Sequence, residues 1–593
     1  MKQLRTVLTS AWSLTSELPL SDLDTALANF MHAQQPSPDA RHLWLAALTS
    51  HQWGHGHACL DLERLRNDAT QLLGWSPQET AQLPPDLADA ASTLPWTQGD
   101  HSPMVWQASP DGAGGRLYLR RAWVAEHTIR QQIALRLAQP SAEPADLQTQ
   151  LDALFPDSAN AAHADMQRQA CALAARHPIT LITGGPGTGK TTTVVRLLAL
   201  LVGAAQAQGR DNLRIHLAAP TGKAAARLSE SISKALRQLP SHLQSAIPTH
   251  TQTLHRLLQV NAYQEAPTQL VADVMVVDEA SMVDLEMMAR LLRALPLHAR
   301  LILLGDKDQL ASVEAGAVMS QLCTGPLLRE QTVTLQHSHR FKQDSGIGQW
   351  AAAVNAGKVH DIQSLWQAAP GWLEPGQTSH DVTRLQLKHS NNQVLGPAFR
   401  EGWRNWLALL RAHPQGQACD DAQALALLKA FAQFCVLCAV REGPWGVGPF
   451  NQHIERALSL PQQTWYIGRP VMVTRNNPHL ELMNGDLGLC LPGPDHVLRV
   501  AFAHPQGGVR WVAPSRLDAV ETAFAMTVHK SQGSEFEHVL LVLPAKDVTV
   551  LSRELIYTGL TRASHKLTLW APDTQVLWDA CARRVLRSGG LGD

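Results

Sequence analysis

Residues 184–191 read GGPGTGKT and lie between the apolar run ITLI at 179–182 and the run TTTVVRLLALL at 191–201. This order of strand, glycine-rich turn and helix is the setting in which a Walker A loop binds a nucleotide. Backbone N–H groups of such a turn cradle phosphates, Lys190 reaches the β and γ oxygens, and the Thr191 hydroxyl holds Mg²⁺. The predicted nucleotide-binding residues are Gly184, Gly185, Pro186, Gly187, Thr188, Gly189, Lys190, Thr191 and Thr192.

The composition of the 593-residue chain is that of a globular protein, with 17% charged and 45% hydrophobic residues. Its length predicts roughly three to five domains. Because the net charge is −1, a nucleic-acid partner would have to bind a local basic groove. The start MKQLRTVLTSAW and the lack of a long uninterrupted apolar run predict neither a signal peptide nor a membrane span. The eight scattered cysteines fit a reducing compartment, so we expect a cytoplasmic protein.

Two stretches of the chain repeat a pattern of strand, turn and helix. In 155–340 the apolar runs ITLITGG, RIHLAAPT, DVMVVDE and RLILLGD each end in a polar or glycine turn. A second series, FCVLCAV, HVLLVLP and KLTLWAP, runs through 341–593. Both series predict an α/β fold with parallel sheets and ligands at the carboxyl ends of the strands. Short β-like pieces at about 487–520 predict a small barrel inserted in the second domain.

The first 150 residues have a different character. They are rich in tryptophan and in amphipathic helical stretches and contain no nucleotide motif. A stretch rich in Pro, Ala and Asp at 139–152 is a plausible linker. We therefore predict a mostly helical N-terminal domain over 1–150 and interpret it as a partner-docking domain.

Acidic and amide side chains follow two of the predicted strands. Asp278 and Glu279, in VMVVDEAS, suit phosphoryl-transfer chemistry, with Asp278 steadying Mg²⁺ and Glu279 activating the attacking water. Gln309, in LLGDKDQLASV, is a candidate sensor of the γ-phosphate. The alternative for Gln309 is an amide that only caps a turn.

Two arginines lie in polar turns, Arg340 in LQHSHRF and Arg562 in YTGLTRAS. Either is a surface arginine or an arginine finger, which contributes about 10³–10⁵ in the rate of phosphoryl transfer. If both contact the nucleotide, the nucleotide lies in a cleft between the domains and hydrolysis is coupled to closure of that cleft.

Three further runs are candidates for contact with single-stranded nucleic acid. They are APTGKAAARL, with Thr221 and Lys223 at a strand-to-helix turn, TLHRLL and MTVHKSQGSEF. Hydroxyl, imidazole and basic groups of this kind bind phosphates or stack on bases without sequence preference. The candidate residues are Thr221, Lys223, Thr253, His255, Thr527 and His529.

The ordered motifs GGPGTGKT, APTGKAAARL, TLHRLL, VVDEASM, LLGDKDQLASV, SHRF, GRPVMVTRN, NGDLG, TVHKSQGSEF and ELIYTGLTRA resemble those of superfamily 1 helicases of 5′-to-3′ polarity. Among these helicases the chain is most similar to the RecD family, the alpha subunits of exodeoxyribonuclease V. The resemblance implies two RecA-like domains, an SH3-like barrel inserted in the second, and ATP and Mg²⁺ as cofactors. It also implies that Gln167, in DMQRQA, reads the adenine. The catalytic residues it implies are Lys190, Glu279, Gln309, Arg340 and Arg562.

The resemblance further implies the partners. They are single-stranded DNA and DNA ends, together with a RecB-like helicase–nuclease and a RecC-like scaffold that form a heterotrimer for recombinational repair. The nuclease centre is expected in a partner subunit, since the sequence has no convincing carboxylate cluster for it. Two alternatives remain: a free-standing RecD-like or conjugative helicase, and a regulatory subunit whose nucleotide site is only a switch. DNA-dependent ATP turnover would distinguish the motor from the switch.

Overall fold

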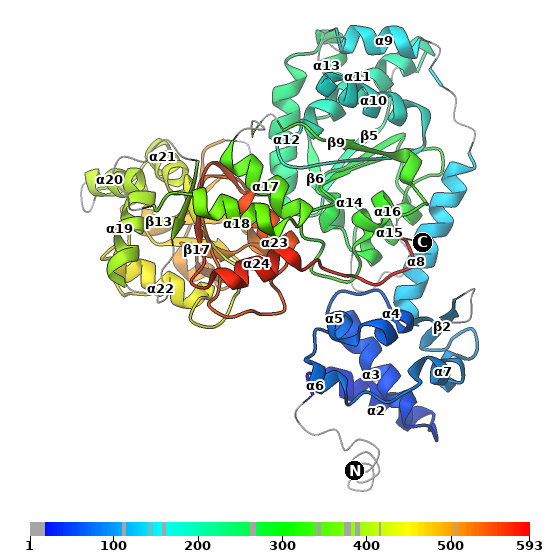
Figure 1. Ribbon diagram of the computed structural model, residues 1–593. Helices are drawn as coiled ribbons and strands as arrows, with labels where there is room; N and C mark the ends of the chain where they lie inside the picture. The colour runs from blue at the N-terminus through cyan, green and yellow to red at the C-terminus, as the bar shows by residue number, and fades with distance from the viewer. Residues whose placement is uncertain are drawn as a thin grey trace.

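A computed structural model gives the fold of the chain (Figure 1). It describes residues 18–109, 114–139, 143–144, 146–156, 162–210, 212–260, 268–338, 340, 345–372, 381–385, 392–413, 417–504 and 507–592. The run at 1–12 and part of the predicted linker at 139–152 lie outside the described residues. None of the helices in these ranges combines the length and apolar character that spanning a bilayer requires.

Residues 18–119 form a helical unit with one small antiparallel sheet of order β1-β3-β2 (Figure 1). Its elements are α2 (Asp22–Gln34), α3 (Arg41–Gly54), β1 (Leu60–Asp61), α4 (Leu62–Asn67), α5 (Ala69–Leu73), α6 (Pro77–Thr80), α7 (Leu87–Ser92), η1 (Pro95–Thr97), β2 (Met104–Ala108) and β3 (Gly115–Leu119). A capping box starts α2, because the Ser21 hydroxyl accepts from the Asp24 N–H and the Asp24 carboxylate accepts from the Ser21 N–H.

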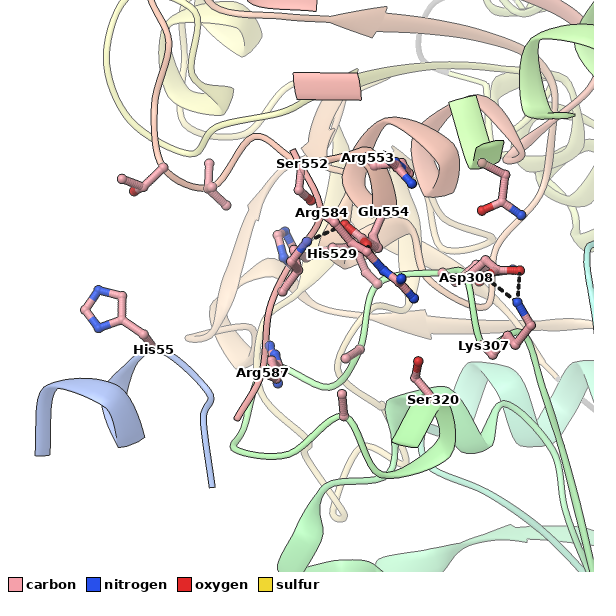
Figure 2. A pocket seen from close by; sticks show the side chains of 18 residues that line it. His55, Lys307, Asp308, Ser320, His529, Ser552, Arg553, Glu554, Arg584 and Arg587 are labelled. Atoms are coloured by element: carbon pink, nitrogen blue, oxygen red, sulfur yellow. Dashed lines mark hydrogen bonds and ion pairs between the residues drawn. The ribbon is translucent and has the colours of Figure 1, made fainter. Parts of the chain in front are cut away.

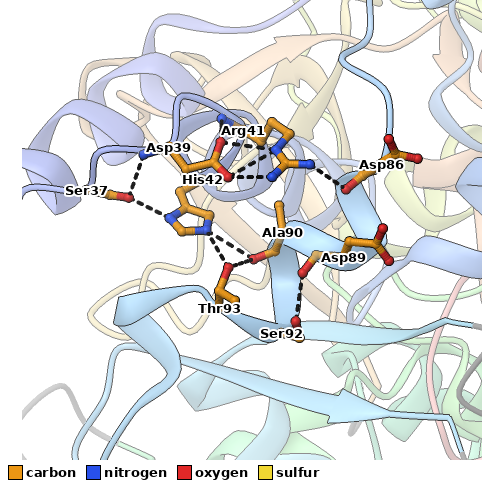
Figure 3. Close-up of polar contacts among 9 residues, drawn as sticks. All are labelled: Ser37, Asp39, Arg41, His42, Asp86, Asp89, Ala90, Ser92 and Thr93. Atoms are coloured by element: carbon orange, nitrogen blue, oxygen red, sulfur yellow. Dashed lines mark hydrogen bonds and ion pairs between the residues drawn. The ribbon is translucent and has the colours of Figure 1, made fainter.

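Three tryptophans of this unit lie in its core. Trp44, Trp75 and Trp96 are all buried. His42, near the start of α3, ties α3 to α7 because its Nε2 lies 3.0 Å from the carbonyl oxygen of Ala90 (Figure 3). Burial lowers the pKa of His42, which favours the neutral ring in this contact. The three tryptophans therefore stabilise the unit rather than forming an exposed docking face.

A first parallel sheet has six strands in the order β6-β5-β7-β8-β4-β9. The strands are β4 (Ile179–Gly184), β5 (Ile215–Ala219), β6 (Thr251–Thr253), β7 (Val274–Val277), β8 (Arg300–Gly305) and β9 (Thr332–Leu335). The other elements around it are α9 (Leu147–Leu154), α10 (Ala162–Arg176), α11 (Lys190–Ala207), α12 (Gly222–Leu236), α13 (Ser241–Gln244), α14 (Leu254–Leu257), η3 (Ala280–Met282), α15 (Leu285–Ala294), α16 (Val318–Thr324) and η4 (Arg329–Gln331). Met275 and Val277 pack on the α15 face, and Val274 and Val276 on the α11 face. Burial on both faces accounts for the continuous apolar runs.

Helix α8 (Arg120–Leu137) packs on this sheet's domain although it lies within the predicted N-terminal range 1–150. Ile129 and Ile133 belong to the same core cluster as β7 and α15. The buried Arg136 donates to the carbonyl oxygens of Leu292 at 2.8 Å and Leu295 at 2.6 Å, at the end of α15. The change from the helical unit to the first sheet's domain therefore occurs at the start of α8.

A second parallel sheet has five strands in the order β10-β19-β18-β11-β17. The strands are β10 (Val382–Leu385), β11 (Phe434–Cys438), β17 (Ala525–Thr527), β18 (Phe536–Val542) and β19 (Ala563–Trp570). The other elements are α17 (Gly346–Ala356), α18 (Val359–Ala368), α19 (Asn392–Gly402), α20 (Arg404–Ala412), α21 (Asp421–Phe431), α22 (Val447–Ala457), η6 (His529–Ser531), α23 (Arg553–Leu560) and α24 (Thr574–Ala582). The two parallel sheets confirm the predicted α/β fold.

A five-stranded antiparallel sheet of order β15-β14-β13-β12-β16 lies between β11 and β17 in the chain. Its elements are β12 (Pro470–Val473), β13 (Leu487–Pro492), β14 (Leu498–Ala503), β15 (Val509–Val512), η5 (Pro514–Arg516) and β16 (Val520–Thr522). The sheet starts before the expected range 487–520, because β12 pairs with both β13 and β16. Its closure into an SH3-like barrel stays a prediction.

The segment after α24 runs back to the first sheet's domain (Figure 1). Ser588 accepts from the Ala58 N–H at 2.8 Å and donates its own N–H to His57 Nδ1 at 3.0 Å. Gly590 donates to the Glu126 carboxylate at 2.9 Å, and Leu591 is fully buried in the core cluster of the first sheet. This segment joins the second domain to both α8 and the N-terminal unit.

Candidate active site

The predicted phosphate-binding loop connects β4, which ends at Gly184, to α11, which begins at Lys190. Gly187 has φ +76° and Gly189 φ +80°, a left-handed conformation that glycine adopts without steric cost. Lys190 Nζ donates to the carbonyl oxygens of Gly184 at 2.6 Å and Gly185 at 3.1 Å. The lysine thus lies folded over its own loop, where phosphate oxygens would exchange for these carbonyl partners.

Replacing Gly187 by alanine is expected to weaken nucleotide binding about tenfold or more. The left-handed conformation costs a non-glycine residue about 1–2 kcal/mol, and the added Cβ would collide with Arg340 Cβ. Titration with a fluorescent ATP analogue measures the effect. Gly203→Ala in α11 is the matched control, because only Gln150 Oε1 lies within 4 Å of its Cβ position, and it should bind like the unchanged chain. Equal affinities for both variants would contradict the expectation.

A cavity of about 490 Å³ at this loop gathers the predicted catalytic residues from both parallel sheets. Its lining includes all of the predicted loop from Pro186 to Thr192, and Asp278, Glu279, Gln309, Arg340 and Arg562, together with Ala224, Arg227, Leu228, Ser231, Lys234, Ala235 and Gln238. The sequence motifs that supply these residues therefore meet in one place. The lining does not include Gln167, which accepts a hydrogen bond from Arg196 Nη1 at 3.3 Å.

The two acidic residues lie directly after β7. Asp278 Oδ1 accepts from the Glu279 N–H at 2.9 Å, and Glu279 has φ +51°, a strained conformation for a residue with a side chain. Burial and the neighbouring Glu279 raise the pKa of Asp278 to about 6. A cation beside Asp278 would lower that pKa again.

The donors present fit Mg²⁺. Asp278 and Thr191 supply a carboxylate and a hydroxyl to the same cavity. Mg²⁺ is usually held by one or two protein oxygens together with water and substrate phosphates. The described residues contain no group of three or more His, Cys, Asp or Glu side chains suited to enclosing a metal ion.

Gln309 and Arg562 form a direct contact across the cleft. Arg562 Nη2 donates to Gln309 Oε1 at 2.8 Å, and Arg562 also donates to the carbonyl oxygens of Thr558 and Ser534. The amino group of Gln309 donates to Asp306 Oδ2 at 2.9 Å within its own turn. The amide therefore holds the turn, as the alternative interpretation expected, and at the same time faces the candidate finger.

Arg340 lies at the cavity from the end of the first domain. Its guanidinium pairs with Glu535, which also pairs with Arg227. Burial lowers the pKa of Arg340 to about 10, while Glu535 counteracts that effect. Sequence reasoning missed Arg227 and Glu535. Both lie inside motifs that were recognised, APTGKAAARL and TVHKSQGSEF, but nothing in their spacing shows that they meet.

The candidate DNA-contacting residues differ in their burial and local contacts. The Thr221 and Thr253 hydroxyls cap α12 and α14, and His255 beside the second cap is exposed. Thr527 is buried, and its hydroxyl accepts from the Lys530 N–H at 3.3 Å. Lys223 is half-buried; burial lowers its pKa, and Cys435 and Asp486 counteract that effect.

His529 lines a second cavity of about 510 Å³, together with Arg553, Arg584 and Arg587 (Figure 2). Burial and the positive charge of Arg587 lower the pKa of His529. Gln309 lines both cavities. The Gln309 turn thus borders both cavities.

Known proteins match this chain along most of its length. Family models described as "RecBCD enzyme subunit RecD, N-terminal domain", "AAA domain" and "UvrD-like helicase C-terminal domain" match residues 17–113, 167–315 and 522–570. The RecBCD enzyme subunit RecD of Haemophilus influenzae is 37% identical, over 92% of both chains. The chain belongs to the RecD family. The Mycolicibacterium smegmatis RecD subunit is 36% identical, over 96% of this chain and 97% of its own.

Two more distant proteins are also similar to this chain. The ATP-dependent RecD2 DNA helicase of Deinococcus radiodurans is 28% identical over 92% of this chain but 67% of its own length. A structure of Bacteroides Pif1 helicase with ADP-AlF3 and ssDNA is 15% identical over 66% of this chain and 88% of its own, with a TM-score of 0.33. The prediction of an ATP-dependent DNA helicase of the RecD family is confirmed by the RecD matches.

Proposed function

We propose that this RecD-family chain is a 5′-to-3′ helicase and translocase on single-stranded DNA that works as the alpha subunit of a RecBCD-type complex. The observation that carries the proposal is the cavity of about 490 Å³ that residues of both domains line. It brings the phosphate-binding loop, the acidic pair, the candidate sensor and both candidate fingers together. A nucleotide bound there contacts both domains, so its hydrolysis changes how they fit together.

The residue roles follow from their chemistry. Lys190 binds the β and γ phosphates, and Glu279 orients and activates the attacking water. Asp278 and Thr191 would hold Mg²⁺, which would supply positive charge against the phosphates. Arg340 and Arg562 stabilise the charge that develops on the γ-phosphate, and Gln309 senses that phosphate. Gln167 reads the adenine; this role rests on the family motif, since Gln167 does not line the cavity.

The finer architecture belongs to the same proposal. The parallel sheets are two RecA-like motor domains, over about 155–340 and 341–593, and the antiparallel sheet is an SH3-like barrel. Thr221, Lys223, Thr253, His255, Thr527 and His529 contact the strand as it passes the motor domains. The 5′-to-3′ direction in this proposal rests on the family resemblance.

The partners proposed are a RecB-like helicase–nuclease, which holds the nuclease centre, and a RecC-like scaffold, with the N-terminal unit as the docking part. The complex would process double-strand ends in the cytoplasm for recombinational repair. The free-standing alternative is less well supported, because the RecD subunits match this chain over 79–97% of their length and the RecD2 helicase over 67%.

The deciding experiment measures ATP hydrolysis by the purified full chain with and without single-stranded DNA, followed by unwinding of duplexes with a 5′ or a 3′ overhang. We expect strong stimulation by DNA and unwinding from the 5′ overhang only. Turnover that DNA does not change would support a nucleotide switch instead. Deleting residues 18–119 while keeping α8 tests docking: recovery of the intact heterotrimer would contradict the docking role of that unit.

A further inference from the structure

One short segment of the second domain donates hydrogen bonds to the turn that carries Gln309. Tyr557, in α23, donates its hydroxyl to Asp306 Oδ2 at 3.1 Å. Arg562, just after α23, donates to Gln309 Oε1 at 2.8 Å. Two residues of the first domain that are three positions apart, Asp306 and Gln309, therefore each have a partner in the second domain.

Two further hydrogen bonds fasten the next residue of this turn. The Leu310 N–H donates to Thr558 Oγ1 at 2.9 Å, and the Leu310 carbonyl oxygen accepts from Gln532 Nε2 at 3.1 Å. Both atoms of the Leu310 backbone are thus bonded to the second domain. These hydrogen bonds connect the turn to α23 and to Gln532 of the second domain.

Asp306 determines which way the Gln309 amide points. Arg562 only donates hydrogen bonds and an ionised carboxylate only accepts them. The amide therefore satisfies both partners in one orientation alone, with its amino group on Asp306 at 2.9 Å and its oxygen on Arg562. Burial raises the pKa of the Asp306 carboxyl, and Lys190 counteracts that effect.

Tyr557 also touches the phosphate-binding loop. A Cβ on Gly185 would lie 2.9 Å from the Tyr557 hydroxyl, and both Tyr557 and Asp306 are buried. The hydroxyl thus sits where the loop, the Gln309 turn and α23 meet. Its hydrogen bond to Asp306 Oδ2 connects α23 to the Gln309 turn.

We propose that Asp306 and Tyr557 are positioning residues of the ATPase reaction, which hold the sensor Gln309 and the finger Arg562 in one clamp across the cleft. This proposal rests on the function proposed above. When the cleft closes on ATP, the clamp keeps the Arg562 guanidinium hydrogen-bonded to the Gln309 oxygen. Without it the nucleotide still binds, because Lys190 and the loop are unchanged, but the finger and the sensor are misplaced for hydrolysis.

The test is the kcat and KM of ATP hydrolysis by the full chain, with and without saturating oligo-dT, for Tyr557→Phe, Asp306→Asn and the double variant. We expect Tyr557→Phe to lower kcat about tenfold and to leave KM within about twofold. Because both variants break the same clamp, the double variant should be no slower than the slower single variant. Tyr557→Phe removes one oxygen atom only, so it keeps the test valid if Asp306→Asn fails to fold.

Tyr118→Phe is the matched control. The Tyr118 hydroxyl is also buried and also donates to a carboxylate, Glu126, at 3.1 Å, but it lies outside the cleft. It should leave kcat unchanged.

Three results would overturn the proposal: a kcat for Tyr557→Phe equal to that of the control, a raised KM at unchanged kcat, or single effects that multiply in the double variant. A wild-type chain that DNA does not stimulate overturns the proposed function and this proposal together; a stimulated wild type with a normal Tyr557→Phe overturns this proposal alone.

Discussion

Lys190→Gln is expected to lower the kcat of ATP hydrolysis by about 10²–10³-fold, the usual cost of removing one charge-stabilising donor from a reaction centre. The ammonium group now bonds the Gly184 and Gly185 carbonyl oxygens. In the proposed function it is a positive group that binds the β and γ phosphates. Glutamine is one atom shorter than lysine, but it keeps a polar end that donates hydrogen bonds and removes the charge, so the loop should keep its shape. Single-turnover and steady-state hydrolysis measure the loss.

The control for Lys190→Gln is Lys429→Gln, on the exposed side of α21. It removes the same charge far from the cleft and should hydrolyse ATP at the wild-type rate. Thermal melting of both variants checks that each chain is folded. Turnover by Lys190→Gln within about tenfold of wild type would show that the loop binds nucleotide without using its lysine for catalysis.

Arg340→Ala is expected to lower kcat by about 10³-fold or more, the range in which arginine fingers contribute. The guanidinium lies at the cavity and is held by Glu535 from the second domain. Because Glu535 keeps Arg227 as a partner, the variant leaves no carboxylate unpaired and should fold normally. Nucleotide affinity should change little, since a finger acts chiefly on the transition state.

The comparison variant for Arg340→Ala is Arg411→Ala, an exposed arginine in the last turn of α20. It should behave as wild type in hydrolysis and in ADP binding. The informative comparison is between the change in kcat and the change in KM that Arg340→Ala causes. A raised KM with an unchanged kcat would make Arg340 a binding group in the ground state and would remove it from the proposed reaction.

Local sequence predicted the parts of the site that depend on neighbouring residues. The strand β4, the glycine turn and the start of α11 at Lys190 follow from the run at 179–201. Left-handed φ values at Gly187 and Gly189 are a property of glycine itself. Asp278 and Glu279 lie at the end of β7 because the preceding apolar run is buried on both faces and stops at the first charged residue.

Patterns of hydrophobicity were less reliable at the boundaries. The antiparallel sheet includes β12 (Pro470–Val473), whose pairing with β13 and β16 depends on strands many residues away. Helix α8 has its apolar residues on the first domain's core, and amphipathic spacing shows only that a helix has a partner. Trp44, Trp75 and Trp96 of the N-terminal unit are core residues, and the number of tryptophans in the sequence did not show this.

The sequence by itself therefore determined the phosphate-binding loop, the acidic pair, the two parallel sheets and the RecD family, since each follows from short-range sterics or from ordered motifs. Only the tertiary structure decided which residues of the two domains contact each other across the cleft. Gln309 and Arg562 are 253 positions apart, and Asp306 and Tyr557 are 251 apart. Contacts at such separation depend on how two separately folded sheets pack together. The same packing unites Arg227, Arg340 and Glu535 and places His529 in a different cavity from the phosphate-binding loop.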